Sequence, residues 1–223
     1  MGIIEYGTSW LLEDQLNIEL LNEIKNFIEN NLEFLHKDKT GYSTKGNNAE
    51  QYWIKKGGKN EFQYSNQEYE NIKQKFRKKV YERLEKASIL RKEEIELGEN
   101  SVWTVIGEEG SYHTTHTHSN YITGGMGGIT TVLYLNVPKS DSDDKSNSIF
   151  LVLHTDPPSN FIISPCPHII HIKPKIGKLL IFPNHIPHGT YPQTKGIRQT
   201  FNVDYHFNIK SKSNSKKHNF NYQ

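Results

Sequence analysis

The chain has 223 residues, of which 34% are hydrophobic and 23% charged, and its formal net charge is +2. This length suits one domain, the small charge gives no reason to expect nucleic acid, and no apolar run approaches the roughly 18 residues that span a membrane. The single cysteine, Cys166, cannot form an internal disulfide and fits a reducing compartment, so we expect a cytoplasmic protein.

Two stretches in the first hundred residues have the spacing of amphipathic helices. Residues 10–35 and residues 67–94 each place apolar side chains three and four positions apart, the second amid dense mixed charge. The apolar positions are Leu12, Leu16, Leu20, Ile24, Phe27 and Ile28 in the first stretch, and Tyr69, Ile72, Phe76, Val80 and Leu84 in the second. Residues 36–66 are rich in Gly, Asn and Lys and keep no period, so we expect a long connection there.

After about residue 100 the pattern changes to short runs of β-branched and aromatic residues, separated by Gly, Pro, Asn, Asp and Ser. Such runs are typical of an antiparallel sandwich or barrel. The runs cover residues 101–106, 128–137, 148–153, 161–164, 168–172, 178–182 and 198–207. The sequence therefore predicts an α+β, mainly β fold, with a jelly-roll core and N-terminal amphipathic helices packed against it.

We expect a single domain over residues 1–208. Its helical N-terminal part would cover residues 1–100 and its β core residues 101–208. Residues 209–223, "IKSKSNSKKHNFNYQ", form a basic, low-complexity segment that we expect to be a disordered tail.

Three histidines in six positions, "HTTHTH", are the strongest sign of a metal site. Residues i and i+2 of a strand face the same side, so His116 and His118 point inward together, whereas His113 has the opposite parity and belongs at the rim. A third group must come from elsewhere, and His185 and His188 follow the apolar run "LLIF". A lone histidine is usually a surface residue, but this group favours a first-row metal such as Fe(II).

The stretch from Trp103 to Thr200 resembles the double-stranded β-helix, or cupin-like, core of the iron(II)- and 2-oxoglutarate-dependent oxygenases. The resemblance is strongest to a phage and bacterial branch near the prolyl 4-hydroxylases. The motifs that carry it are Trp103, Gly110, "HTH" at 116–118, "TVLYLN" at 131–136, Gly177, "LLIFP" at 179–183, His188, Arg198 and Thr200.

This resemblance implies roles for individual residues. His116 and His188 would be iron ligands, and Arg198 would form a salt bridge with the distal carboxylate of 2-oxoglutarate. Thr200 would add a hydroxyl hydrogen bond to the same carboxylate. Arg198 could also be a surface charge that begins a strand, but its spacing from His188 favours the functional interpretation.

Position 118 departs from the family pattern, because most of the superfamily has Asp or Glu there. His118 could itself coordinate the iron, giving a three-histidine site, or a carboxylate such as Asp156 or Asp204 could supply the missing charge, or the position could stay open. Three neutral imidazoles leave the full +2 charge on the ion, which changes its redox behaviour. We favour coordination by His118.

The activity that the resemblance implies is that of a dioxygenase. It would hydroxylate an unidentified small-molecule or peptidyl substrate with O2, with oxidative decarboxylation of 2-oxoglutarate to succinate and ascorbate as a reductant. Tyr52 and Trp53 are candidate substrate contacts. One alternative is a cupin-like three-histidine metalloenzyme without 2-oxoglutarate, which leaves Arg198 and Thr200 unexplained. The other is a non-enzymatic jelly-roll binding module.

Overall fold

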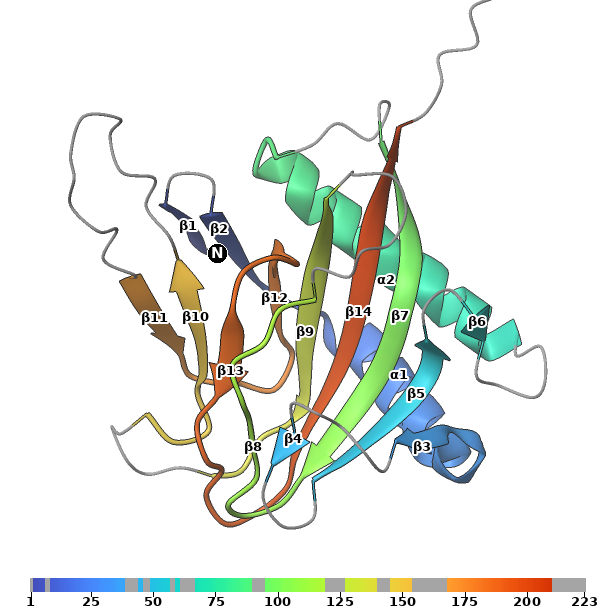
Figure 1. The fold of residues 1–223 in the computed structure, drawn as a ribbon. Coiled ribbons are helices and arrows are strands. Elements are labelled where there is room, and N and C mark those ends of the chain that lie inside the picture. The colour runs from blue at the N-terminus through green and yellow to red at the C-terminus, as the bar shows by residue number, and fades with distance from the viewer. Residues whose placement is uncertain are drawn as a thin grey trace, which may run out of the picture.

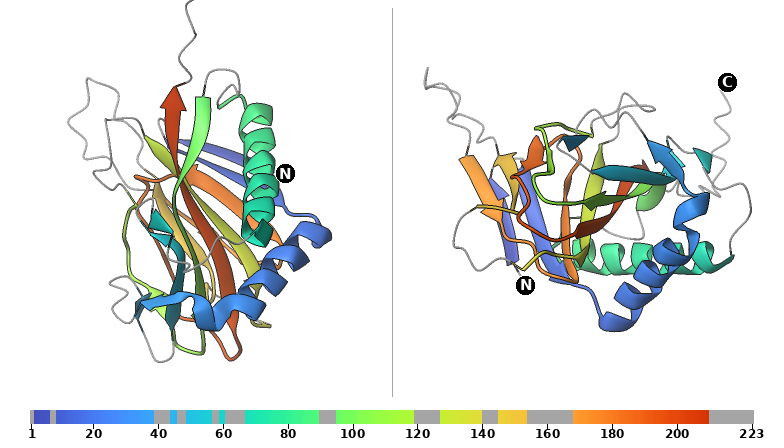
Figure 2. Two further views of the ribbon diagram at one scale, coloured as in Figure 1. Left: turned by 90° about the vertical axis from the view of Figure 1, so that its right-hand side faces the viewer. Right: turned by 90° about the horizontal axis from the view of Figure 1, so that it is seen from below.

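The strands form two main antiparallel sheets, and two helices cover the outer face of the larger one (Figures 1 and 2). The computed structural model describes residues 2–6, 9–38, 44–45, 49–56, 59–60, 67–89, 95–118, 127–139, 145–153 and 168–209. In spatial order the large sheet contains β1 (Gly2–Tyr6), β2 (Ser9–Gln15), β12 (Lys178–Pro183), β9 (Gly128–Asn136), β14 (Arg198–Ile209), β7 (Ile95–Gly107), β5 (Glu50–Lys56) and β3 (His36–Asp38), and β6 (Lys59–Asn60) pairs with β5. The smaller sheet contains β11 (His168–Ile172), β10 (Ile149–Leu153) and β13 (His188–Thr190), and β4 (Thr44–Lys45) pairs with β8 (Tyr112–His113).

The helices are α1 (Ile18–Asn31), which a short 3-10 turn (Leu32–Phe34) extends, and α2 (Gln67–Lys86). Both bury one apolar stripe, which confirms amphipathic helices packed against a β core. All the apolar positions expected to be buried are buried: Leu12, Leu16, Leu20, Ile24, Phe27, Ile28, Tyr69, Ile72, Phe76, Val80 and Leu84. Neither described helix is long and apolar enough to cross a membrane.

The interpretation of residues 1–100 as a helical part is wrong in several places. The first helix was expected over residues 10–35, but residues 10–15 belong to β2, which pairs with β12 from Leu12 opposite Ile181 to Gln15 opposite Lys178. The expected connection over residues 36–66 contains β3, β4, β5 and β6. Pairing in the sheets gives the backbone N–H and C=O groups of these segments their hydrogen-bond partners. In residues 10–15 this tertiary pairing overrides the local helical pattern.

The second helix is shorter than the expected 67–94. It ends at Lys86, and Ser88 takes a left-handed backbone conformation with φ of 57°. The amide of Ile89 then donates to the carbonyl of Leu84, which closes the end of the helix.

The large sheet is buried on both faces. Leu12, Leu179 and Ile181 belong to the core between this sheet and the helices, whereas Leu11 and Leu180 belong to the core between the two sheets. Because successive side chains of a strand face opposite sides, β2 and β12 each contribute to both cores.

The strands expected after residue 100 agree with β7, β9, β10, β11, β12 and β14. The run expected over residues 161–164 lies outside the described residues, as does the expected tail apart from its first residue, Ile209, which ends β14.

Candidate functional site

The floor of the site is the face of the large sheet that looks toward the smaller sheet. Alternate residues of β14 lie on this face, and the antiparallel register places each beside partners on β9 and β7. The rows are Tyr134–Thr200–Val105, Val132–Asn202–Trp103 and Thr130–Asp204–Ser101, with Arg198 at the start of β14. Beyond β7 the floor continues through Gln51 and Trp53 on β5, opposite Val105 and Trp103.

A cavity of about 470 Å³ lies over this floor. Its other walls come from residues 113–118, from Ile149 on β10 and from β13. Small-molecule sites in proteins are typically about 300–1,000 Å³, so this cavity suits a small co-substrate together with part of a second molecule.

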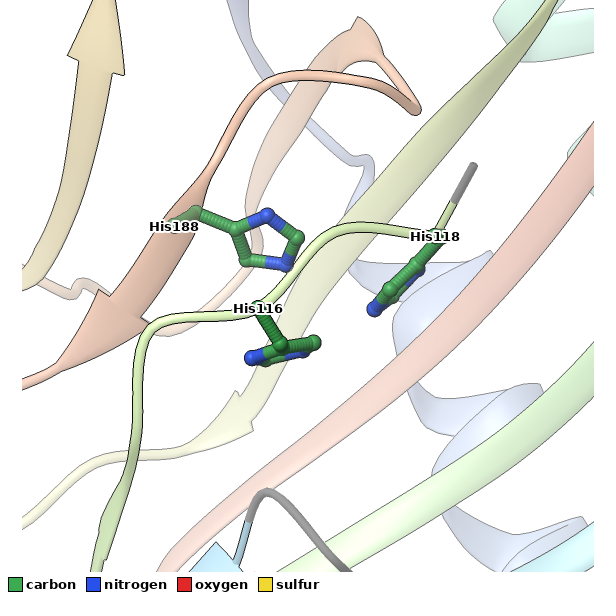
Figure 3. A group of neighbouring side chains, drawn as sticks. All are labelled: His116, His118 and His188. Carbon is green, nitrogen blue, oxygen red and sulfur yellow. The ribbon is translucent and has the colours of Figure 1, made fainter. Parts of the chain in front are cut away.

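His116, His118 and His188 meet in this cavity (Figure 3). The backbones of His116 and His188 exchange two hydrogen bonds of 2.9 Å, and the amide of His118 donates to Asn184, also at 2.9 Å. These bonds hold the histidine segment against β13. One ring nitrogen from each histidine lies within 4.8 Å of the other two, so the three side chains can ligate one ion.

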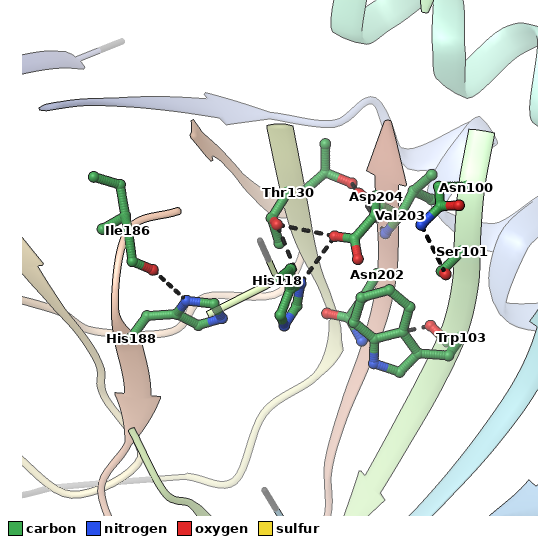
Figure 4. A network of polar contacts seen from close by, with 11 residues as sticks. Asn100, Ser101, Trp103, His118, Thr130, Ile186, His188, Asn202, Val203 and Asp204 are labelled. Atoms are coloured by element: carbon green, nitrogen blue, oxygen red, sulfur yellow. Dashed lines mark hydrogen bonds and ion pairs between the residues drawn. The ribbon is translucent and has the colours of Figure 1, made fainter. Parts of the chain in front are cut away.

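The hydrogen bonds of the rings determine which nitrogen of each ring is free to bind a metal ion. The Nδ1 atoms of His116 and His188 lie 2.8 Å and 2.9 Å from the carbonyl oxygens of Thr114 and Ile186. A carbonyl oxygen only accepts, so each Nδ1 carries the proton and each Nε2 keeps its lone pair. The Nδ1 of His118 lies 2.9 Å from a carboxylate oxygen of Asp204 in the same arrangement (Figure 4). All three Nε2 atoms are therefore ready to bind a metal ion.

Burial keeps the imidazoles of His116 and His188 neutral. It lowers the pKa of His116 to about 4, with a further contribution from His118. Burial, followed by the charges of His118 and His116, also holds the pKa of His188 well below its ordinary value. Metal binding at neutral pH therefore displaces no proton from these two rings.

His113 differs from its expected place. The chain bends at Thr115, so the alternation of a regular strand does not continue from His113 to His116. His113 consequently lines the same cavity, with its ring centroid 5.8 Å from that of His116. Burial, followed by the charge of Arg198, lowers its pKa to about 3. His185 is exposed and does not belong to the cluster.

Of the two carboxylates considered for the missing charge, Asp156 lies outside the described residues. Asp204 is buried on β14 and contacts the site through the Nδ1 of His118. Asp204 does not belong to the cluster of ligand atoms, which is made of imidazoles alone.

Arg198 lies in the same cavity with a relative exposure of only 5%. Its guanidinium donates to the carbonyl of Asn147 at 3.3 Å and to the hydroxyl of Thr190 at 3.1 Å. Within the described part of the chain no carboxylate forms an ion pair with it. A buried cation with free donors and no counter-ion fits an anionic ligand, as the distal carboxylate of 2-oxoglutarate would be.

Tyr134 lines the cavity together with Arg198 and was not among the site residues predicted from the sequence. It faces the cavity beside Thr200, and its buried hydroxyl has no hydrogen-bond partner among the described residues. Burial raises its pKa to about 12, so it remains a donor at any physiological pH. Strand alternation from Thr130 would have placed it on the cavity face, but only once the direction of that face was known.

The other end of the cavity is aromatic and carries a paired charge. The rings of Trp53 and Trp103 are 5.4 Å apart, and Trp103 packs edge-on against His118 at 5.3 Å. Asp38 accepts from the indole N–H of Trp53 at 3.1 Å and from Lys56 at 3.4 Å. Of the two candidate substrate contacts, Trp53 lines the cavity, whereas Tyr52 lies in the core on the helix side.

Residues 101–204, nearly half of the chain, match a protein family described as "Putative 2OG-Fe(II) oxygenase", where 2OG is 2-oxoglutarate. No curated protein matches the chain. Among solved structures, a prolyl-4-hydroxylase from Pseudomonas putida is 13% identical with a TM-score of 0.57, and the match covers 89% of this chain and 92% of that one.

Two further structures are similar to the chain. The 2OG complex of a viral collagen prolyl hydroxylase from Paramecium Bursaria Chlorella virus-1 is 16% identical, with a TM-score of 0.54 and coverage of 88% and 95%. HygX from Streptomyces hygroscopicus, with nickel, 2-oxoglutarate and hygromycin B bound, is 12% identical, with a TM-score of 0.56 and coverage of 89% and 83%. Residues 101–204 therefore match the 2OG-Fe(II) oxygenase family, and the fold of the chain is the double-stranded β-helix of these enzymes.

Proposed function

We propose that the chain hydroxylates its substrate with Fe(II) held by His116, His118 and His188 and with 2-oxoglutarate anchored by Arg198. The observation that carries this proposal is the shared state of the three imidazoles: each Nδ1 has an acceptor, which leaves three Nε2 lone pairs directed into one cavity. Such outer partners are typical of metal-binding histidines.

When bound, Fe(II) and 2-oxoglutarate supply O2 activation, with decarboxylation to succinate and transfer of an oxygen atom to the substrate; ascorbate would serve as reductant. The protein's own groups bind and orient. Arg198 neutralises the distal carboxylate, and Thr200 and Tyr134, opposite each other in register, donate hydroxyl hydrogen bonds to it. Water is excluded there, because all three side chains are buried.

The primary substrate, a small molecule or a peptidyl side chain, would bind at the end formed by Trp53, Trp103 and Asp38. This end lies on β7, β5 and β3, whereas the co-substrate end lies on β9 and β14. Adjacent strands are about 4.8 Å apart, so Trp53 on β5 lies roughly 14 Å across the sheet from Tyr134 on β9, and the three histidines line the same cavity. Since Asp38 is already paired with Lys56, the wall favours an uncharged group that packs against the indole rings.

Arg198 is buried, and no carboxylate pairs with it among the described residues, which favours this function over a three-histidine enzyme that uses no oxo acid. It also argues against a binding module without an enzymatic activity, because a buried guanidinium is costly unless an anion joins it. We further propose a cytoplasmic location, which the single cysteine supports.

An anaerobic titration tests the proposal. Fe(II) protein mixed with 2-oxoglutarate should develop a visible metal-to-ligand absorption band, and admission of air should release succinate. His188→Ala should abolish the band by removing one ligand. Iron binding without any band, and without succinate, would favour the enzyme class that uses no oxo acid.

A further inference from the structure

His118 is held differently from the other two histidines of the cluster. The rings of His116 and His188 are each fixed by a neutral backbone carbonyl. The Nδ1 of His118 instead faces the carboxylate of Asp204 at 2.9 Å, and the hydroxyl of Thr130 lies 3.1 Å from the same nitrogen (Figure 4). One imidazole of three is therefore coupled to a full negative charge.

Among the described residues, His118 is the one basic side chain within salt-bridge distance of Asp204, and the side chains of the two are only 13% and 10% exposed. Thr130, directly opposite Asp204 in the sheet, donates to the same carboxylate oxygen at 2.9 Å and so fixes its direction. In such low-dielectric surroundings a charge acts strongly on its neighbour, here on the N–H of the imidazole.

We propose that Asp204 acts through His118 as a relayed carboxylate, supplying the negative charge that an aspartate ligand would bring in most relatives. Asp204 is a positioning residue in this role, because it touches the ligand rather than the ion. By accepting the Nδ1 proton it holds the Nε2 lone pair toward the metal, and by its charge it makes that nitrogen a stronger donor. This inference rests on the proposed metal site.

Trp103 also contacts His118. Its ring meets that of His118 edge-on at 5.3 Å with an interplanar angle of 60°. The imidazole is therefore restrained against rotation both by this ring and by its polar contacts with Asp204 and Thr130. Such restraint reduces the conformational entropy that ordering the ligand on metal binding would cost.

The test is Zn(II) affinity, measured by chelator competition in the wild type, Asp204→Asn, His118→Asp and the double variant. Asp204→Asn keeps the shape and should weaken Zn(II) binding about 10- to 100-fold. In the His118→Asp background the same change should cost less than about twofold, because a carboxylate then binds the ion directly. Asp14→Asn on β2 is the matched control and should leave Zn(II) affinity unchanged, because the Asp14 side chain, 9% exposed, pairs with Lys79 of α2.

A second measurement needs no metal. Nitrogen-15 NMR of the metal-free wild type should show His118 protonated at Nδ1, and Asp204→Asn should raise the fraction protonated at Nε2. An equal loss of Zn(II) affinity in both backgrounds would mean that Asp204 only supports the sheet, and would overturn the relay. So would His118 protonated at Nε2 in the wild type. Absence of Zn(II) binding by the wild type would instead remove the proposed metal site itself.

Discussion

Arg198 offers a direct test of how the cavity recognises an oxo acid. Its guanidinium is 5% exposed and has no carboxylate partner in the described ranges, so a bound carboxylate would complete a buried charge pair. Truncating one partner of such a pair costs about 2–5 kcal/mol, which corresponds to roughly 30-fold to several thousand-fold in Kd. Arg198→Ala should therefore weaken 2-oxoglutarate binding within this range.

The assay compares two ligands under anaerobic conditions. The Fe(II) protein is titrated with 2-oxoglutarate and with 2-oxobutyrate, which has the oxo-acid group but lacks the distal carboxylate. Because Arg198 would contact only that carboxylate, Arg198→Ala should change the Kd of 2-oxobutyrate by less than about threefold. The four Kd values form a double-mutant cycle that isolates the interaction between Arg198 and the distal carboxylate. Arg77→Ala on α2 removes the same charge from the opposite face of the sheet and serves as control.

Two results would refute this reasoning. An equal loss of affinity for both ligands would mean that Arg198 supports the cavity wall, through Asn147 and Thr190, rather than binding the co-substrate. An unchanged Kd for 2-oxoglutarate would place the distal carboxylate elsewhere.

Three further changes have defined outcomes. Tyr134→Phe removes one hydrogen bond to a charged carboxylate, worth about 1.5–3 kcal/mol, so the same titration should show a Kd for 2-oxoglutarate raised about 13- to 160-fold. An unchanged Kd would exclude the contact. Glu99 is buried, which raises its pKa, so the folded state binds this proton more tightly than the unfolded state and loses stability as pH rises through the raised value. Glu99→Gln keeps an acceptor for the hydroxyl of Tyr69. Urea unfolding should therefore find this variant more stable than wild type at pH 8, by a difference that shrinks toward pH 4.5. A difference that stays constant with pH would mean that it does not come from the titration of Glu99. Phe76→Ala, 1% exposed and edge-on to Phe201, should cost about 3–5 kcal/mol by the same unfolding, and a cost below about 1 kcal/mol would mean that α2 packs only loosely.

Much of the site could be predicted from sequence because its parts lie at fixed local spacings. The pair His116 and His118 and the run from His188 to Arg198 each fall within short segments, and the structure brings both to one cavity. Their roles as ligands stay predictions, as does the division into a domain over 1–208 and a tail. His113 was misplaced because strand parity holds only while the strand is regular, and the chain bends after it.

The N-terminal elements were harder to predict for a physical reason. Leu12 and Leu16 have the spacing of a helix, but Leu12 belongs to a strand that is buried on both faces and therefore shows no alternation. The partner that stabilises it, β12, lies more than 160 residues along the chain. Tyr134 and Asp38 were missed in the same way, because each reaches the cavity from a strand whose neighbours are known only once the sheet order is known.

The strands beneath the cavity fall into two groups according to the roles proposed for their residues. The proposed co-substrate and metal residues lie on interior strands and segments within residues 101–204, whereas Trp53 and Asp38 come from strands outside that range, toward one edge of the sheet. Of these two strands β3 lies at the edge, where it pairs with β5 among the described strands. A substitution at Asp38 therefore changes the proposed substrate wall without disturbing the pairing of the strands that carry the proposed metal and co-substrate residues.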